Sequence, residues 1–271
     1  MELITFASAW CFGSLDRCCR EVELGHFDGV EGPAPLDTSL RSRFEHMPFI
    51  AEICTGGDYA PASSVEPERH FDDLDRQLAA AAACGAVLAS CLFGSDAWSF
   101  SQAVDAYGRA LELGAALGVP VSFETHRGRP TFHPRLTLDL LFALPDLRLT
   151  CDLSHWCVVS ERLIDQPHVI DAVAARARHM HARVGYAQGP QVPDPRVAAY
   201  RNELSAHETW WTALWRAAHA RGEPRFSATP EFGPDGYLQT HPVSGQPAAD
   251  LDELNVWMSQ HLRQRFSELF A

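Results

Sequence analysis

Apolar and polar positions alternate in blocks along the entire chain. Apolar runs of roughly four to eight residues, bounded by glycine, proline or charged residues, are typical of buried strands. Such runs occur at residues 3–8, 27–32, 48–54, 86–93, 120–124, 147–152, 177–183 and 225–232. Stretches with helical spacing separate them, most clearly at residues 14–25, 100–118, 207–222 and 250–270. The pattern predicts repeated strand–helix units, with Ser14 and Gly25 capping the first helix.

Eight strand–helix units without a low-complexity linker predict an α/β protein, a single (β/α)8 TIM barrel that forms one domain over residues 1–271. An open doubly wound sheet is the alternative. That fold often carries a G-x-G-x-x-G turn after its first strand, and this sequence has none. The apolar run from Leu78 to Gly94 approaches the length of a membrane span, but Gly85 interrupts it. We therefore expect a helix end, a turn and a buried strand there, and no membrane partner.

The charged residues exclude several classes of function. The chain of 271 residues has a net charge of −13, so a nucleic-acid partner is not expected. All 22 basic residues are arginine. Schiff-base aldolase chemistry and covalent pyridoxal phosphate attachment both need a lysine amine, and a P-loop would lack its lysine.

Cysteine usage and the first residues bear on the compartment. The eight cysteines form no C-x-x-C pair, and several lie in apolar runs, so we expect reduced thiols. The first ten residues lack the basic region of a signal peptide. Both observations predict a cytoplasmic protein.

Acidic and imidazole side chains stand where four consecutive predicted strands end. In a barrel, functional residues gather at the carboxyl ends of the strands, and side chains two apart share a face. Glu124, Asp152 and Glu231 end three of these strands, and His179 and His181 both face inward on the fourth. Three adjacent carboxylates would repel one another unless a cation neutralised them. Oxygen and imidazole ligands therefore predict a divalent metal site.

The sequence resembles the xylose-isomerase-like TIM-barrel superfamily of sugar isomerases and epimerases over nearly its full length. The motifs that carry the resemblance are GHFDGVEGP (25–33), SFETHRG (122–128), TCDLSHW (150–156), HMHAR (179–183) and TPEFGPDGY (229–237). The resemblance to ketose 3-epimerases implies one divalent ion, foremost Mn²⁺, with Co²⁺, Mg²⁺, Zn²⁺ or Fe²⁺ as alternatives. The implied ligands are Glu124, Asp152, His181 and Glu231. It also implies that Glu124 and Glu231 act as the acid–base pair and that His155 contacts the substrate. We assign His179 to a hydrogen-bonded supporting role.

The sequence departs from other members of this superfamily. Hydride-shifting xylose isomerases use two metals and a lysine, which this chain lacks. AP endonucleases need histidines on strands two to four and an Asp-x-His after strand seven. Here Asp194 is followed by Pro195 and Arg196, so DNA repair is the weakest alternative. The long segment 182–196 leaves room for a substrate other than a free ketose.

Other side chains near the strand ends have two interpretations each. His126, Arg127, Arg129 and Arg183 could bind a carboxylate or phosphate, or could be solvated loop residues. Trp10, Phe93 and Trp156 could stack on a sugar ring, or could be core residues. Phe12, Trp98 and Phe232 have the same two interpretations. Glu31 and Glu52 could reach the site or pair with arginine. Trp210, Trp211 and Trp215 have helix-packing spacing and predict contacts with the barrel or with another subunit.

These expectations converge on a metal-dependent isomerase or epimerase of a keto-sugar, polyol or related hydroxy-ketone. One glutamate removes the proton next to the carbonyl, which forms a cis-enediolate held by the metal. A lyase or dehydratase that eliminates a β-substituent shares this first step and stays open. A non-catalytic accessory barrel subunit is the alternative outside enzymes. We expect a homo-oligomer, a dimer or tetramer.

Overall fold

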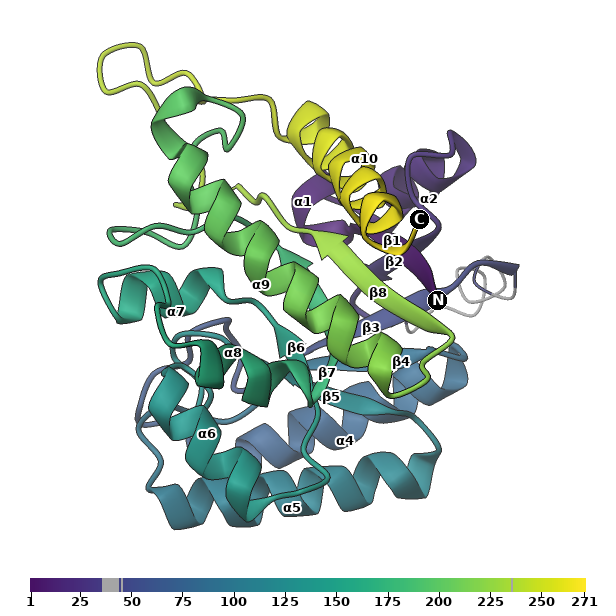
Figure 1. Cartoon of the computed structure of the whole chain (residues 1–271). Helices are drawn as coiled ribbons and strands as arrows, with labels where there is room; N and C mark the ends of the chain where they lie inside the picture. Colours follow the sequence, from purple (N-terminus) through teal and green to yellow (C-terminus); the bar gives the residue numbers. More distant parts are fainter. Residues whose placement is uncertain (36–43, 45, 235) are drawn as a thin grey trace.

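Eight parallel strands close into a barrel in chain order, with β1 pairing with β8. The computed structural model describes residues 1–35, 44, 46–234 and 236–271, and within them the closed sheet confirms the predicted (β/α)8 fold (Figure 1). The strands are β1 (Glu2–Ser8), β2 (Gly29–Gly32), β3 (Phe49–Cys54), β4 (Leu88–Leu92), β5 (Val121–Glu124), β6 (Leu149–Cys151), β7 (Ala177–Ala182) and β8 (Arg225–Pro230).

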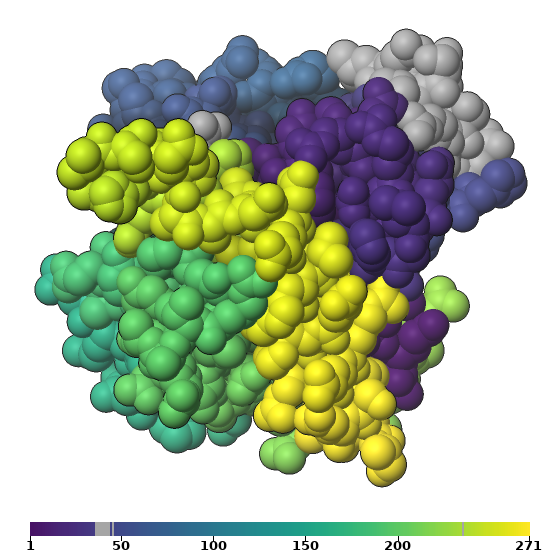
Figure 2. Space-filling view, turned by 90° about the horizontal axis from the view of Figure 1, so that it is seen from above, coloured from purple at the N-terminus to yellow at the C-terminus, as the bar shows by residue number. Residues whose placement is uncertain are grey.

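Helices surround the barrel and lie between most successive strands. They are α1 (Ala9–Phe12), α2 (Leu15–Glu23), α4 (Pro67–Ala83), α5 (Phe100–Leu117), α6 (Pro134–Ala143), α7 (Ser154–Val159), α8 (Pro167–Ala174), the 3-10 helix η2 (Ala198–Tyr200), α9 (Arg201–Ala220) and α10 (Leu251–Phe270). The space-filling view shows α10, in yellow, lying along the purple N-terminal segment (Figure 2). This packing closes the ring of helices.

Local signals place several element ends close to their predicted positions. Ser14 accepts a hydrogen bond from the backbone of Arg17 and caps α2 as expected, although Leu24 rather than Gly25 is the C-cap. The apolar run 78–94 divides as predicted, because α4 ends at Ala83 and Gly85 adopts a positive φ of 65° before β4 begins. Among the described residues, no helix is long and apolar enough to cross a membrane.

The barrel interior changes in character along its axis. At the amino ends of the strands, Phe6, Ile50 and Leu88 form an apolar cluster. Above it, the Thr150 hydroxyl lies 3.0 Å from the Ser90 hydroxyl and 2.7 Å from that of Ser122. The carboxyl ends of the strands follow, and there the interior becomes acidic. The apolar end thus supports the fold, while the polar end is free for chemistry.

The aromatic residues of α9 belong to the core. Trp210, Trp211 and Trp215 are buried against the barrel and neighbouring helices. The predicted barrel contact is therefore present, and the suggestion that the face around Trp211 binds another subunit is wrong, because that face is already covered. All eight cysteines are free thiols, most of them buried.

Candidate metal centre

Four side chains from consecutive strand ends converge at the acidic end of the barrel. Glu124 ends β5, Asp152 follows β6, His181 lies in β7 and Glu231 follows β8. Each offers one ligand atom, and these four atoms all lie within 4.8 Å of one another. All four side chains are almost completely buried. This is the set that the resemblance implies, and strand position with side-chain alternation predicts its three carboxylates.

His181 presents one ring nitrogen to the carboxylates and anchors the other. Its Nε2 lies 3.1 Å from Oε1 of Glu31, and because a carboxylate accepts, Nε2 carries the proton. Its Nδ1 is buried without a hydrogen-bond partner among the described residues. That Nδ1 lies 3.5 Å from Oε1 of Glu124 and 3.1 Å from Oε2 of Glu231. A lone pair facing two carboxylates is repulsive unless a proton or a metal cation lies between them.

His179 has a different environment, which distinguishes it from His181. Its Nδ1 lies 2.8 Å from the Ser227 hydroxyl, and its Nε2 lies 3.2 Å from both Oε2 of Glu31 and the Thr229 hydroxyl. Both ring nitrogens therefore have partners. Glu31, at the end of β2, connects the two histidines, a role that the sequence left undecided.

Asp152 is held in one orientation from two sides. One carboxylate oxygen accepts hydrogen bonds from the backbone and hydroxyl of Ser154, and the other accepts from Nη2 of Arg183. Nη2 also lies 3.5 Å from Oε2 of Glu231. Burial raises the pKa of Asp152, and the charge of Arg183 offsets this only in part.

Burial also shifts the pKa of two glutamates in the site. It raises the pKa of Glu124 to about 7, although the charge of His181 opposes the shift. It raises the pKa of Glu52, in β3, to about 8, and the charges of Glu231 and Glu31 add to this increase. For His181, burial alone would lower the pKa, but the surrounding carboxylates raise it well above its usual value. The site attracts positive charge.

A cavity of about 310 Å³ opens above these residues. Its lining includes Glu52, Glu124 and Glu231, together with His126 and five aromatic or basic residues described below. A volume of this size suits a small molecule at the carboxyl end of a barrel.

Aromatic rings form one wall of this cavity. The ring of Trp10 lies 5.1 Å from that of Tyr237 and 6.2 Å from that of Tyr59. The guanidinium of Arg183 lies 4.6 Å from the centre of the Tyr237 ring. Gly233 allows this packing, because a Cβ atom there would lie 1.8 Å from a ring carbon of Trp10. Trp10 lines the cavity as expected, whereas Tyr59 and Tyr237 are in loops whose course the sequence did not reveal.

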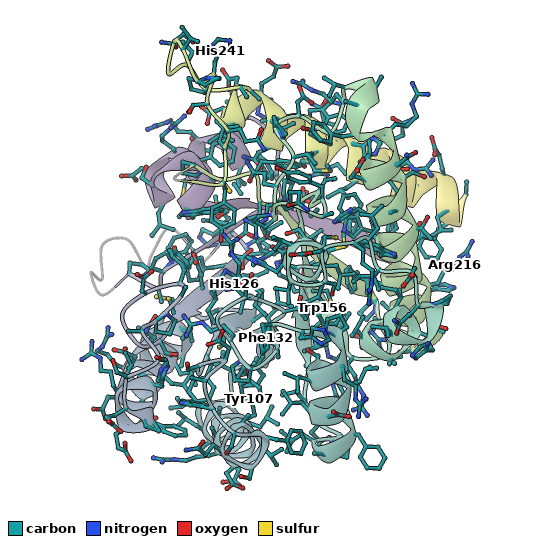
Figure 3. All side chains as sticks on the ribbon, turned by 90° about the vertical axis from the view of Figure 1, so that its left-hand side faces the viewer. Tyr107, His126, Phe132, Trp156, Arg216 and His241 are labelled. Carbon is teal, nitrogen blue, oxygen red and sulfur yellow. The ribbon has the colours of Figure 1, made fainter. Side chains whose placement is uncertain are left out.

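Phe93 and Trp156 are not in this wall, contrary to the prediction. Phe93 is fully buried beneath the strands against Phe123. Trp156 is also fully buried, and its Nε1 donates to the backbone oxygen of Thr131 at 3.0 Å. Figure 3 shows Trp156 inside the molecule, with His126 on the neighbouring segment. Both aromatic residues stabilise the barrel rather than contact its cavity.

His155 lies next to the cavity lining but outside it. Its Nε2 accepts from Nη2 of Arg183 at 2.8 Å, and its ring packs on that of His126 with 3.9 Å between ring centres. Burial lowers the pKa of His155, and the neighbouring His126 and Arg183 lower it further. We expected His155 to contact the substrate and therefore to face the cavity. Its neutral ring instead supports Arg183 and His126.

The two arginines after β5 have separate roles. Arg127 lines the cavity. Arg129 is fully buried and donates to the backbone oxygens of Thr55, Gly94 and Asp58, so it joins the loops after β3 and β4. Of the interpretations left open for Arg129, ligand binding therefore does not fit.

Solved structures of similar fold include a ketose epimerase, a probable dehydratase and a protein with a bound zinc atom. The D-allulose 3-epimerase from Methylomonas sp., in complex with D-allulose, is 13% identical, with a TM-score of 0.65 and 97% of each chain covered. The probable 3-DHS dehydratase from Bacillus anthracis is 14% identical, with a TM-score of 0.65 and coverage of 97% of this chain and 98% of that one. The IOLI protein with a bound zinc atom is 10% identical, with a TM-score of 0.64 and coverage of 97% and 96%.

The chain shares the (β/α)8 barrel fold of these structures. No family model and no curated protein sequence matches the chain. At these identities the likeness establishes the fold. Function has to be argued from the residues of this barrel.

The four converging residues suit a divalent metal. Three carboxylates and one imidazole form a mixed oxygen and nitrogen set, the kind used for Mn²⁺, Fe²⁺, Co²⁺ or Zn²⁺. The unpartnered Nδ1 of His181 is the decisive atom, because Glu31 holds the opposite ring nitrogen as metal-ligating histidines require. Without a metal, a proton on His181 supplies the positive charge.

Proposed function

We propose that this chain is a divalent-metal-dependent isomerase or epimerase of a keto-sugar or a related hydroxy-ketone. The observation that carries the proposal is the unpartnered Nδ1 of His181 facing Glu124 and Glu231 beside a cavity of about 310 Å³. The D-allulose complex and the zinc-containing IOLI protein, both of this fold, support a sugar ligand and a metal.

Glu124, Asp152, His181 and Glu231 would hold the ion, and Mn²⁺ is the ion that we propose. When bound, such an ion supplies Lewis-acid polarisation of a substrate carbonyl. Arg183 and Ser154 keep the Asp152 carboxylate in place, while Glu31 keeps the proton of His181 on Nε2.

Glu124 and Glu231 would carry the proton transfers. One carboxylate accepts the proton from the carbon next to the carbonyl, and a carboxyl group returns a proton to the product. Both carboxylates line the cavity in which the substrate would lie, as groups that exchange protons with it must. Return to the opposite face of the same carbon gives an epimer, and return to the neighbouring carbon gives an isomer.

Elimination is a second candidate reaction, and Glu52 favours it. This carboxyl group lines the cavity, and burial raises its pKa to about 8, so it is protonated at neutral pH. It could donate its proton to a departing hydroxyl, which leaves as water after Glu124 removes the proton next to the carbonyl. The product would then be lighter than the substrate by one water molecule, which mass spectrometry detects.

Metal content is the first test of the proposal. Protein purified without a metal-affinity tag should contain about one divalent ion per chain by plasma mass spectrometry, and Asp152→Asn should lose it. Asp146→Asn, an exposed aspartate on the loop before β6, is the matched control and should retain the ion. Wild-type protein with metal should exchange one substrate C–H proton with D₂O. Protein that binds no metal even after divalent ions are added would refute the site and favour an accessory subunit.

A further inference from the structure

The polar lining of the cavity includes groups that the proposed proton transfers do not use. Besides its carboxylates, the cavity is lined by His126 and Arg127, from the segment after β5, and by Arg183, at the end of β7. Arg183 is already engaged with Asp152 and Ser154. Of the two arginines in the lining, Arg127 is therefore the one whose role is still unexplained.

The guanidinium of Arg127 has hydrogen-bond donors available for a ligand. This group lies 5.1 Å from the centre of the Tyr237 ring. No ion pair joins Arg127 to a carboxylate of the described residues. A guanidinium carries five N–H donors, and packing against a ring leaves them available for a ligand. Arg129, two residues further on, instead uses its donors on backbone oxygens.

His126 offers the complementary hydrogen-bonding group. Its Nδ1 lies against the backbone oxygen of Arg127, and because a carbonyl only accepts, Nδ1 is the donor. Nε2 of the neutral ring is then an acceptor for a hydroxyl group. Adjacent residues thus provide a cation and a hydroxyl acceptor in one cavity.

We propose that Arg127 binds an anionic group, a carboxylate or a phosphate, on the part of the substrate away from His181, and that His126 accepts a hydrogen bond from a neighbouring hydroxyl. The inference rests on the proposed function and narrows it to keto-sugar acids or keto-sugar phosphates. A neutral sugar would offer this partly exposed guanidinium hydrogen bonds but no counter-charge. An anion would pair with it through two parallel hydrogen bonds.

Three ligands that differ at one carbon test this proposal. D-Fructose, D-fructuronate and D-fructose 6-phosphate carry a hydroxymethyl, a carboxylate and a phosphate ester at the same end. Titration calorimetry on the purified protein should show at least one anionic ligand binding roughly tenfold more tightly than D-fructose. The anion that binds more tightly identifies the source of the charge.

Substitution of Arg127 should abolish this preference. In Arg127→Gln the ratio of the D-fructose Kd to the anion Kd should fall to about one, and Arg127→Lys should give an intermediate ratio because a lysine cannot bind in a fork. Arg20→Gln, an exposed arginine on α2, is the matched control and should keep the wild-type ratio. Circular dichroism establishes that each variant is folded.

The outcomes separate this inference from the proposed function. Anions that bind no better than D-fructose, no binding by any of the three ligands, or an unchanged ratio in Arg127→Gln would overturn the anion site. Metal content and D₂O exchange measured on the same preparations report on the function itself. A protein without metal that still binds an anion through Arg127 would retain the anion site and lose the isomerase proposal.

Discussion

Glu31 is not one of the four converging residues, but it determines which ring nitrogen of His181 is available. Its carboxylate accepts from Nε2 of both His179 and His181, and the Thr229 hydroxyl donates to it as well. Burial would raise the pKa of Glu31, but the charges and hydrogen bonds of the two histidines lower it overall. The charged carboxylate therefore fixes which nitrogen of His181 is available.

We predict that Glu31→Gln weakens metal binding without abolishing it. The amide still accepts from Nε2 but loses the negative charge that makes the imidazole a better ligand, so the Kd for Mn²⁺ should rise about 10- to 100-fold. Competition with a fluorescent chelator measures this Kd. Glu68→Gln, on the exposed first turn of α4, should leave it unchanged. An unchanged Kd in Glu31→Gln would contradict the supporting role of Glu31.

At the scale of elements, each helix returns the chain to the amino end of the barrel and its ends must satisfy free backbone groups. The clearest device is at α5, where the Ser99 side chain accepts from the backbone of Gln102 and the Gln102 side chain accepts from the backbone of Ser99. This capping box lies between β4 and β5, the strand that delivers Glu124.

Loss of this box should lower stability and leave the metal site intact. Ser99→Ala removes the acceptor for the Gln102 backbone, so we expect the free energy of unfolding in urea to fall by about 1 kcal/mol. Ser267→Ala, on the exposed side of α10, should cause little change. Metal content should equal that of wild type in both variants. A loss of metal in Ser99→Ala would show that α5 controls the site more directly.

At the scale of the whole molecule, charge is distributed unevenly. The chain carries a net charge of −13, and Glu31, Glu52, Glu124, Asp152 and Glu231 gather at one end of the barrel. Burial raises the pKa of Glu52 to about 8 and that of Glu124 to about 7. Between about pH 4.5 and these values, the two glutamates bind more protons in the folded metal-free chain than in the unfolded chain. Buried histidines such as His70 and His155, whose pKa burial lowers, bind fewer protons in the folded chain below about pH 6.5.

Above about pH 7 the histidines of the unfolded chain are mostly neutral, so the stability of the metal-free protein should fall as pH rises from about 7 to about 9. The raised pKa of His181 acts in the same direction. Urea unfolding in the presence of a chelator at about pH 7, 8 and 9 measures this slope. Glu52→Gln should flatten it, since the amide does not titrate, and added Mn²⁺ should stabilise the protein most at high pH because its ligands are then deprotonated. A stability that increases over this range would contradict the assignment.

Much of the fold and part of the site could be predicted from the chain alone. Eight apolar runs separated by helical spacing determine a closed barrel, because each strand must be covered by a helix. The two-residue period then brings Glu124, Asp152 and Glu231 inward at neighbouring strand ends. These are local properties of strands, so the sequence determines them.

Tertiary structure alone decided which polar groups are used. His179 and His181 share a face, and the surroundings of Nδ1 distinguish them. Ser227 on the adjacent strand bonds Nδ1 of His179, whereas Nδ1 of His181 faces Glu124 and Glu231. In loops, no fixed period relates the position of a residue in the sequence to the direction of its side chain. Arg127 thus lines the cavity while Arg129 is buried, and Tyr237 covers a site that no pattern assigned to it. Strand order determined where the chemistry lies, and packing between distant segments decided which side chains can perform it.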